Sequence, residues 1–312
     1  MEKIPLVAVV GPTASGKTAL SVEIAKALDG EIVSADSMQI YRGLDIATAK
    51  PSEDEKQGIP HHLMDFVDPC ESFSVARFCE LGHEAIKDIY SRKKLPIIAG
   101  GTGLYVDALL GAMRFEEQDE DLALRVLITT ELQEKGIDKM LEEIRTFDPE
   151  SAERLGIERN PKRIVRCIEV YRSTGMTQTE LNKKQLNADP PYRTVKIGLS
   201  ATDRDYLYDR IDRRVDQMMD NGLLEEARRF YDGDFGDTAA AAIGYKELLP
   251  YLEGEQDLDI CVGSLKRSTR RYAKRQQTWF KRDPSIRWFM IDRLSFDDIT
   301  SEAIDYIKKE LL

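Results

Sequence analysis

A phosphate-binding motif stands near the start of the chain. Residues 11–18, Gly-Pro-Thr-Ala-Ser-Gly-Lys-Thr, match the pattern G-x-x-x-x-G-K-[ST] at every position. Glycines let the backbone curl so that its N–H groups converge on phosphate oxygens, while Lys17 adds a positive charge and Thr18 a hydroxyl for Mg²⁺. The motif therefore predicts a phosphate site with Mg²⁺ as cofactor. The residues expected to hold the phosphates are Gly11, Thr13, Ala14, Ser15, Gly16, Lys17 and Thr18.

A possible proton acceptor follows this motif. Residues 36–39, Asp-Ser-Met-Gln, come directly after a strand-like segment at 31–35. A typical P-loop NTPase would show an apolar strand ending in a metal-binding aspartate, but the apolar segment 95–99 here ends in Gly-Gly-Thr-Gly, residues 100–103. Asp36 could serve as a general base if it lies within hydrogen-bond reach of a nucleophile. An aspartate here would also suit a simple turn or helix cap, so this segment alone leaves both interpretations open.

The charge distribution is uneven. The formal net charge of −11, from 45 basic and 56 acidic residues, argues by itself against a polyanionic partner. Residues 261–282, however, contain no acidic residue. On a helix, Arg267, Arg271 and Lys274 would form one stripe that could follow RNA phosphates. Further positive charge comes from Lys266, Arg270 and Lys281. The alternative is a solvated basic face, which usually carries interspersed acids.

Elements that would position these groups alternate along the chain. Short apolar segments, separated by helical patterns, predict strands at 4–10, 31–35, 95–99, 195–200 and 286–291. This alternation predicts an α/β fold, in which a P-loop NTPase-like parallel sheet core is flanked by helices. Because ligands bind at the carboxyl edge of such sheets, the phosphate motif and residues 36–39 should meet there.

Strand signals stop between about residues 115 and 191. Charged helical periodicity replaces them at 122–135, 137–147 and 161–172. We therefore predict a helical insertion domain, residues 115–191, within a catalytic core formed by residues 1–114 and 192–312. The acidic start of the insertion, residues 116–121, would repel phosphate locally, so we expect its basic parts to contact RNA.

Other features point to an ordinary reduced protein. The four cysteines are too dispersed for a zinc site or a disulfide framework, and the adjacent His61 and His62 suit a structural role better than a metal site. No apolar run approaches the roughly 20 residues that cross a membrane, and the first residues lack the regions of a signal peptide. We expect a cytoplasmic protein without a membrane partner, and a monomer.

Five segments resemble, in this order, those of the bacterial tRNA dimethylallyltransferase (isopentenyltransferase) family. They are residues 11–18, 34–51, 58–65, 100–105 and 242–247. The phosphate motif is generic, but Asp-Ser-Met-Gln at 36–39 with the tail Thr-Ala-Lys-Pro at 48–51 is highly specific. The resemblance covers essentially the whole chain, up to the basic helix before Trp279.

The resemblance implies that the phosphate motif holds the diphosphate of dimethylallyl diphosphate rather than ATP. It implies that Asp36 takes a proton from N6 of the adenosine 3′-adjacent to the anticodon (nucleotide 37), that this nitrogen attacks the allylic C1, and that diphosphate leaves. The exocyclic amine is a poor nucleophile because its lone pair is delocalised into the ring, so a positioned base would help. Lys17, Mg²⁺ on Thr18 and Thr102 would stabilise the leaving group.

An arginine on the helix after the insertion would complete the diphosphate clamp. Within residues 210–218, alignment with that helix favours Arg214, while Arg210 and Arg213 stay open. The alternative is a solvated helix face, because Asp212 and Asp216 could pair with neighbouring arginines.

The resemblance also implies contacts with the tRNA anticodon stem-loop. A stacked base must be flipped out to reach a buried carboxylate. The expected tRNA-binding residues are Asp36, Ser37, Met38, Gln39, Lys162, Arg163, Arg166, Ile243, Gly244 and Tyr245, together with the stripe Arg267, Arg271 and Lys274. Tyr245 is a candidate for base stacking, although an aromatic residue beside glycine is more often core.

Two other functions stay open at this point. A small-molecule or nucleotide kinase would share the phosphate motif, a nearby carboxylate and a helical lid, but it would turn over ATP and would not need the basic helix. A non-catalytic RNA-binding protein that uses nucleotide as a switch would leave Asp36 and its segment unexplained. Labelled dimethylallyl diphosphate and bulk tRNA would separate both from prenyl transfer.

Overall fold

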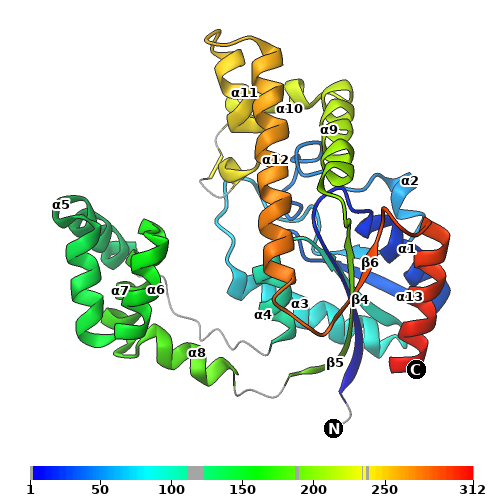
Figure 1. Cartoon of the computed structure of the whole chain (residues 1–312), viewed down its shortest axis with the longest axis horizontal. Helices are drawn as coiled ribbons and strands as arrows, with labels where there is room; N and C mark the ends of the chain where they lie inside the picture. Colours follow the sequence, from blue (N-terminus) through cyan, green and yellow to red (C-terminus); the bar gives the residue numbers. More distant parts are fainter. Residues whose placement is uncertain (1–2, 112–121, 187–189, 234, 237–238, 312) are drawn as a thin grey trace. The chain divides into compact units, whose positions relative to one another are not determined.

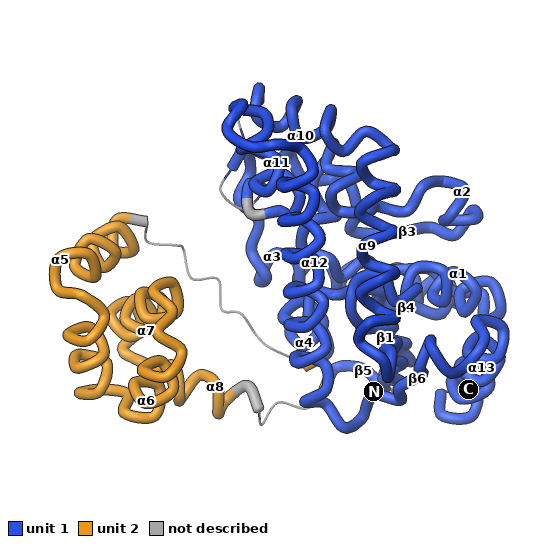
Figure 2. Tube along the Cα trace, turned by 45° about the horizontal axis from the view of Figure 1, so that its top comes forward, with its two compact units in different colours: residues 1–110, 191–312 blue, residues 111–190 orange. Residues whose placement is uncertain are grey.

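The computed structural model describes residues 3–111, 122–186, 190–233, 235–236 and 239–311. The chain divides into two compact units, one of residues Met1–Leu110 with Pro191–Leu312 and one of Gly111–Pro190 (Figure 2). The acidic segment predicted at the start of the insertion, residues 116–121, lies outside the described residues. None of the helices in the described ranges has the length and apolar character that a bilayer crossing demands.

A six-stranded parallel sheet forms the centre of the larger unit (Figure 1). Its order is β3-β2-β4-β1-β5-β6, with β1 Ile4–Val10, β2 Gly30–Ser34, β3 His61–His62, β4 Leu95–Gly100, β5 Tyr192–Ser200 and β6 Ile286–Met290. The predicted α/β fold with a parallel, P-loop-like sheet is confirmed. Strand β3 was not predicted, because a two-residue strand is too short to show alternation.

Strand β1 lies in the middle of the sheet and is apolar because it is buried. Other strands pair with both of its edges. Val7 is paired with Ile97 of β4 on one side and with Val195 of β5 on the other. Helices α1 (Lys17–Leu28) and α13 (Phe296–Leu311) pack together in one core cluster with these strands, whereas α3 (Val75–Ser91) and α4 (Gly103–Leu110) pack on each other, with α3 on β2 and β4 and α4 on β4. The carboxyl ends of these parallel strands therefore lie along one edge of a sheet that is packed against helices.

A group of helices stands beside that edge (Figure 1). It consists of α9 (Arg204–Asp220), α10 (Leu223–Tyr231), α11 (Tyr245–Leu252) and α12 (Leu258–Phe280), with the short 3₁₀ helix Ala239–Ala241. Its apolar core also contains Tyr41 and Leu44 from the segment after β2. This shared core ties the loop that follows β2 to the helices.

The smaller unit is helical. It contains α5 (Leu122–Phe147), α6 (Pro149–Glu158), α7 (Pro161–Thr174) and α8 (Gln178–Leu186) around its own apolar core. Gly136, at φ 78°, interrupts α5 with a kink between the two helices predicted at 122–135 and 137–147. Asn160 begins α7, since its side chain accepts the N–H of Arg163.

Candidate active site

The phosphate motif forms the turn between β1 and α1. Gly16, at φ 93°, lies at the N-cap, so α1 begins at Lys17. Gly11 has φ 144°, and a Cβ there would stand 2.3 Å from the carbonyl oxygen of Leu199 in β5. Glycine is therefore required at this position by both backbone conformation and space. The free N–H groups of α1 face the turn, as an anion site requires.

Lys17 is half-buried in this turn. Its Nζ donates a hydrogen bond to the carbonyl of Pro12 at 2.7 Å. The pKa of Lys17 is lowered to about 7, mainly by burial and then by the nearby Arg214, while Asp36 acts in the opposite direction. Because a diphosphate would stabilise the charged ammonium, binding of such a ligand should restore the proton to Lys17.

Asp36 follows β2 and forms a turn as well as a wall of the site. Its Oδ1 accepts the backbone N–H of Met38 at 3.0 Å. Burial raises the pKa of Asp36, while the Met38 N–H, Lys17 and Arg214 act to lower it. The two interpretations left open by the sequence are thus compatible: the residue closes a turn and also presents a half-buried carboxylate with increased basicity.

Gly100, the last residue of β4, packs closely against the segment that contains Asp36. A Cβ on Gly100 would stand 2.2 Å from the carbonyl oxygen of Ala35. Thr102 then accepts the N–H of Ser37 on its hydroxyl at 3.0 Å. The Thr102 hydroxyl also donates to the hydroxyl of Ser37 at 3.3 Å, so Thr102 contacts a residue that lines the cavity described below without lining that cavity itself. Its role in a diphosphate clamp stays a prediction.

Replacement of Gly100 by alanine should therefore destabilise the larger unit. The added methyl would collide with backbone rather than with a flexible side chain, so we expect a loss of about 1–3 kcal/mol in the free energy of unfolding. Urea unfolding measures this. Gly263→Ala in α12, where the new methyl meets only Arg267 at 3.5 Å, is the control. An unchanged free energy of unfolding in Gly100→Ala would contradict this close packing.

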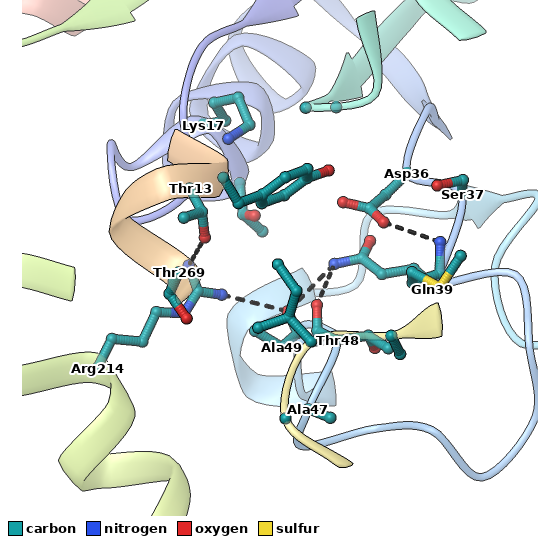
Figure 3. Close-up of a pocket in the computed structure, with 18 of the residues that line it drawn as sticks. Thr13, Lys17, Asp36, Ser37, Gln39, Ala47, Thr48, Ala49, Arg214 and Thr269 are labelled. Atoms are coloured by element: carbon teal, nitrogen blue, oxygen red, sulfur yellow. Dashed lines mark hydrogen bonds between the residues drawn. The ribbon is translucent and has the colours of Figure 1, made fainter. Parts of the chain in front are cut away.

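These elements enclose a cavity of about 300 Å³ (Figure 3). Its walls come from the phosphate turn, the segments after β2 and β4, α9, residues 242–244 and α12. The predicted site residues that line it are Thr13, Lys17, Thr18, Asp36, Ser37, Met38, Gln39, Arg214, Ile243 and Gly244. The sequence therefore identified the residues of the phosphate turn, Asp36 and Arg214 that meet here, but not the polar residues that α12 contributes.

Among the three arginines considered on α9, Arg214 alone lines the cavity. Its guanidinium donates to the Thr13 hydroxyl and to the Ala49 carbonyl, both at 3.4 Å (Figure 3). Arg210 instead donates to the Ala14 carbonyl at 2.8 Å, and Arg213 is exposed. Burial lowers the pKa of Arg214, because nearby carboxylates offset only part of the cost of removing its positive charge from water.

Gln39 lines the cavity, but the structure uses its amide to support a loop. Its Nε2 donates to the carbonyls of Thr48 and Ala49 at 3.1 and 3.2 Å, and its Oε1 accepts from Ser34 at 3.2 Å. Contact with an adenine stays a prediction for this residue.

The sequence reasoning missed the inner face of α12. Gln276, 5% exposed, accepts the N–H of Thr13 at 2.8 Å and donates to the Gly101 carbonyl at 3.0 Å. Tyr272 also lines the cavity, and burial together with Asp36 raises its pKa above its usual range. A detectable signal existed, since Thr269, Tyr272 and Gln276 place polar groups at helical spacing on the face of the buried Leu265 and Ala273.

The outer face of α12 carries the predicted basic stripe. Its exposed members are Arg267, Arg271 and Lys274, and among the residues that the structure describes none of them has an acidic partner within salt-bridge distance. Lys266 and Arg270 instead pair with Asp216 and Asp212 of α9, at 2.6 and 3.2 Å. The unpaired surface is therefore narrower than the sequence suggested, and the two aspartates pair across helices rather than with arginines of α9.

The prediction that Tyr245 stacks on an RNA base is wrong. Its side chain is fully buried, its hydroxyl donates to Glu226 at 2.9 Å, and its ring stacks on Phe230 at a centroid distance of 4.3 Å. Tyr245 belongs to the core of the helical group. Its predicted neighbours Ile243 and Gly244 do line the cavity.

Three predicted RNA-binding residues, Lys162, Arg163 and Arg166, lie exposed on α7 of the smaller unit. Arg163 pairs with Glu158 at 2.5 Å, and Arg166 with the buried Glu169 at 2.9 Å. Their contact with RNA stays a prediction.

The two histidines each have a local partner. His62 contacts Glu31 through Nε2 at 2.7 Å, and His61 contacts the Ile59 carbonyl through Nδ1 at 2.8 Å. Within the described part of the chain, no group of three histidine, cysteine, aspartate or glutamate side chains could hold a metal ion. A divalent cation would therefore depend on ligand oxygens and on the Thr18 hydroxyl, which lines the cavity.

Family models match nearly the whole chain. The model described as IPP transferase matches residues 39–283, and the model described as Isopentenyl transferase matches residues 4–65. The chain is 43% identical to the tRNA dimethylallyltransferase of Halalkalibacterium halodurans, over 99% of this chain and 98% of that protein. It is 45% identical to that of Geobacillus thermodenitrificans, over 98% and 97%.

Solved structures agree with these matches. The tRNA isopentenylpyrophosphate transferase of Bacillus halodurans superposes with a TM-score of 0.74 at 42% identity, over 99% of this chain and 97% of that one. A eukaryotic dimethylallyltransferase acting on tRNA gives a TM-score of 0.82 at 28% identity, over 98% and 80%.

Proposed function

The chain belongs to the IPP transferase family of tRNA dimethylallyltransferases, and we infer that it transfers the dimethylallyl group of dimethylallyl diphosphate to tRNA. The predicted class of enzyme, a prenyl transferase, is confirmed, and the kinase alternative is not favoured. One observation carries the chemistry: a half-buried carboxylate, Asp36, shares a single cavity with the phosphate turn and Arg214.

The phosphate turn would bind the diphosphate of the donor. Backbone N–H groups at the start of α1 and the ammonium of Lys17 provide positive potential at one end of the cavity. The guanidinium of Arg214 already contacts Thr13 of that turn. As the C1–O bond breaks, negative charge grows on the diphosphate, so Lys17 and Arg214 would stabilise the transition state more than the ground state.

Asp36 would hold the acceptor nitrogen and remove its proton. We propose N6 of the adenosine 3′-adjacent to the anticodon (nucleotide 37) as the acceptor, giving N6-dimethylallyladenosine and diphosphate. The raised basicity that burial gives Asp36 suits proton transfer from a weakly nucleophilic amine. Ser37 and Met38 line the cavity beside Asp36 and would contact the flipped base.

Mg²⁺ fits the donor set of the cavity and is the proposed cofactor. Thr18 would be its protein ligand, and the remaining ligands would be diphosphate oxygens and water, the type of oxygen shell that Mg²⁺ prefers. When bound, the cation would offset charge on the diphosphate.

The test is transfer of radiolabelled dimethylallyl from its diphosphate to an anticodon stem-loop with adenosine 3′ of the anticodon. A matched stem-loop with guanosine at this position is the control. Label on the adenosine substrate alone supports the proposal. Absence of transfer, together with hydrolysis of ATP or transfer of its γ-phosphate, would favour a kinase instead.

The stripe of α12 gives a separate prediction. Replacement of Arg267, Arg271 and Lys274 by alanine should weaken tRNA binding and reduce the slope of log K against log salt by up to about three, because fewer counterions are released. Filter binding at several salt concentrations measures both. Affinity for dimethylallyl diphosphate should not change, and Lys308→Ala with Lys309→Ala, exposed on α13, is the control. An unchanged salt slope would exclude the stripe from the RNA interface.

A further inference from the structure

Glu226 of α10 is a buried carboxylate outside the cavity. It is 3% exposed. Its Oε2 accepts the backbone N–H groups of Asp45 and Ile46 at 3.0 and 2.8 Å. Its Oε1 accepts the N–H of Ala47 at 2.8 Å and the hydroxyl of Tyr245 at 2.9 Å. Four donors therefore converge on one side chain.

These bonds hold the loop of residues 45–49, which we call the cavity loop. Three successive N–H groups that converge on an anion form a nest, which here is filled by a side chain rather than by a phosphate. Lys50 holds the other end of the loop, with Nζ at 2.6 Å from both Asp45 and Asp65. Ala47, Thr48 and Ala49 of this loop line the cavity (Figure 3).

The carbonyl of Ala49 links the cavity loop to the catalytic residues. It accepts hydrogen bonds from Gln39 at 3.2 Å and from Arg214 at 3.4 Å, and Figure 3 shows both side chains pointing toward it. The second Nη of Arg214 contacts Thr13 in the phosphate turn. The direction of the guanidinium is thus determined by one acceptor on the loop and one on the turn.

We propose that Glu226 is a positioning residue for prenyl transfer. By holding the cavity loop through three N–H groups, it places the Ala49 carbonyl, and that carbonyl directs Arg214 toward the diphosphate that leaves. The proposal rests on the proposed function, because it assumes that Arg214 contacts this leaving group. It also explains the buried Tyr245 hydroxyl, which donates the fourth hydrogen bond to the Glu226 carboxylate.

Glutamine at position 226 would keep the size of the side chain but not its four acceptor positions. An amide has one oxygen, so its NH₂ group must face either the N–H groups of Asp45 and Ile46 or that of Ala47. At least one donor then loses its partner, which displaces the loop. Arg214 would lose its acceptor at Ala49.

The experiment is a double-mutant cycle on kcat, with single-turnover transfer to the stem-loop as the readout. Wild-type transfer is measured first, because its absence would refute the proposed function and not the role of Glu226. Given transfer, Glu226→Gln should lower kcat about tenfold or more in the wild-type background, but less than about threefold in an Arg214→Ala background. Equal losses in both backgrounds, or no loss, would overturn the proposal.

Glu31→Gln is the matched control. Glu31 is also 3% exposed and holds Arg92 and His62, but it does not contact the cavity loop. Its replacement should lower the unfolding temperature without lowering kcat. If Glu226→Gln does not fold, Tyr245→Phe takes its place, because it removes one donor and keeps the ring packing. A loss of kcat that disappears in the Arg214→Ala background supports the proposal, and a loss that persists there overturns it.

Discussion

Replacement of Asp36 by asparagine is expected to lower kcat for dimethylallyl transfer about 10²- to 10⁴-fold, the usual contribution of a positioned general base. The amide preserves the acceptor for the Met38 N–H, so the turn should persist. Affinity for dimethylallyl diphosphate should change little, because Asp36 would act on the adenine amine. Single-turnover transfer with equilibrium binding of the donor separates the two effects.

The pH dependence provides the control. Because burial raises the pKa of Asp36, the acidic limb of the wild-type pH–rate profile should lie above the ordinary carboxyl range and should vanish in Asp36→Asn. The folded protein then binds more protons at this site than the unfolded chain, so the contribution of Asp36 to stability falls as pH rises through that window. Asp36→Asn should unfold at an equal or higher temperature near neutral pH. Retained transfer in this variant would show that Asp36 is not the general base.

Replacement of Lys17 by methionine should lower kcat/KM for dimethylallyl diphosphate about 10²- to 10³-fold, because the charge that stabilises the diphosphate is lost. Methionine keeps most of the apolar stem and removes the ammonium that burial disfavours. We therefore expect the loss of binding without a loss of stability. Calorimetric titration with diphosphate and thermal unfolding measure the two quantities.

The direction of the pH effects distinguishes loss of the Lys17 ammonium from general destabilisation of the fold. Lys17 has a folded pKa of about 7 against an ordinary value of 10.5, so the folded protein binds fewer protons between these values and its stability rises with pH across the window. Diphosphate binding requires the charged form, so affinity in the wild type should fall by up to tenfold per pH unit above 7. Lys17→Met should show neither dependence. A slope that persists in this variant would assign the titration to another group.

Local patterns predicted the parts of the site that lie at strand ends. The apolar segments at 4–10, 31–35 and 95–99 implied parallel strands, and parallel strands bring their carboxyl ends to one edge. The meeting of the phosphate turn with Asp36 therefore followed from the order of elements alone. The position of Arg214 could not be predicted in this way. Helical periodicity does not distinguish among the three arginines of α9, because the direction of each side chain depends on packing.

The remaining contacts have no local signature. Glu226 binds backbone groups about 180 positions earlier in the chain, and Gln276 binds Thr13 at a separation of 263. Backbone donors are the same at every residue, so the sequence cannot indicate which of them a distant side chain will bind. Tyr245 shows the converse error, because an aromatic residue after glycine suits both a stacking platform and a core, and burial decides between them.

The strand order also determines when the site can form during synthesis. β1 lies between β4 and β5, so its two neighbours are residues 97–100 and 192–198. A ribosome releases the N-terminus first, and an apolar strand without partners invites aggregation until they emerge. The phosphate turn itself depends on Leu199, whose carbonyl packs against Gly11. Because β5 ends at Ser200, β1 gains its second neighbour and the phosphate turn gains its contact with Leu199 only after about two-thirds of the 312 residues have been translated.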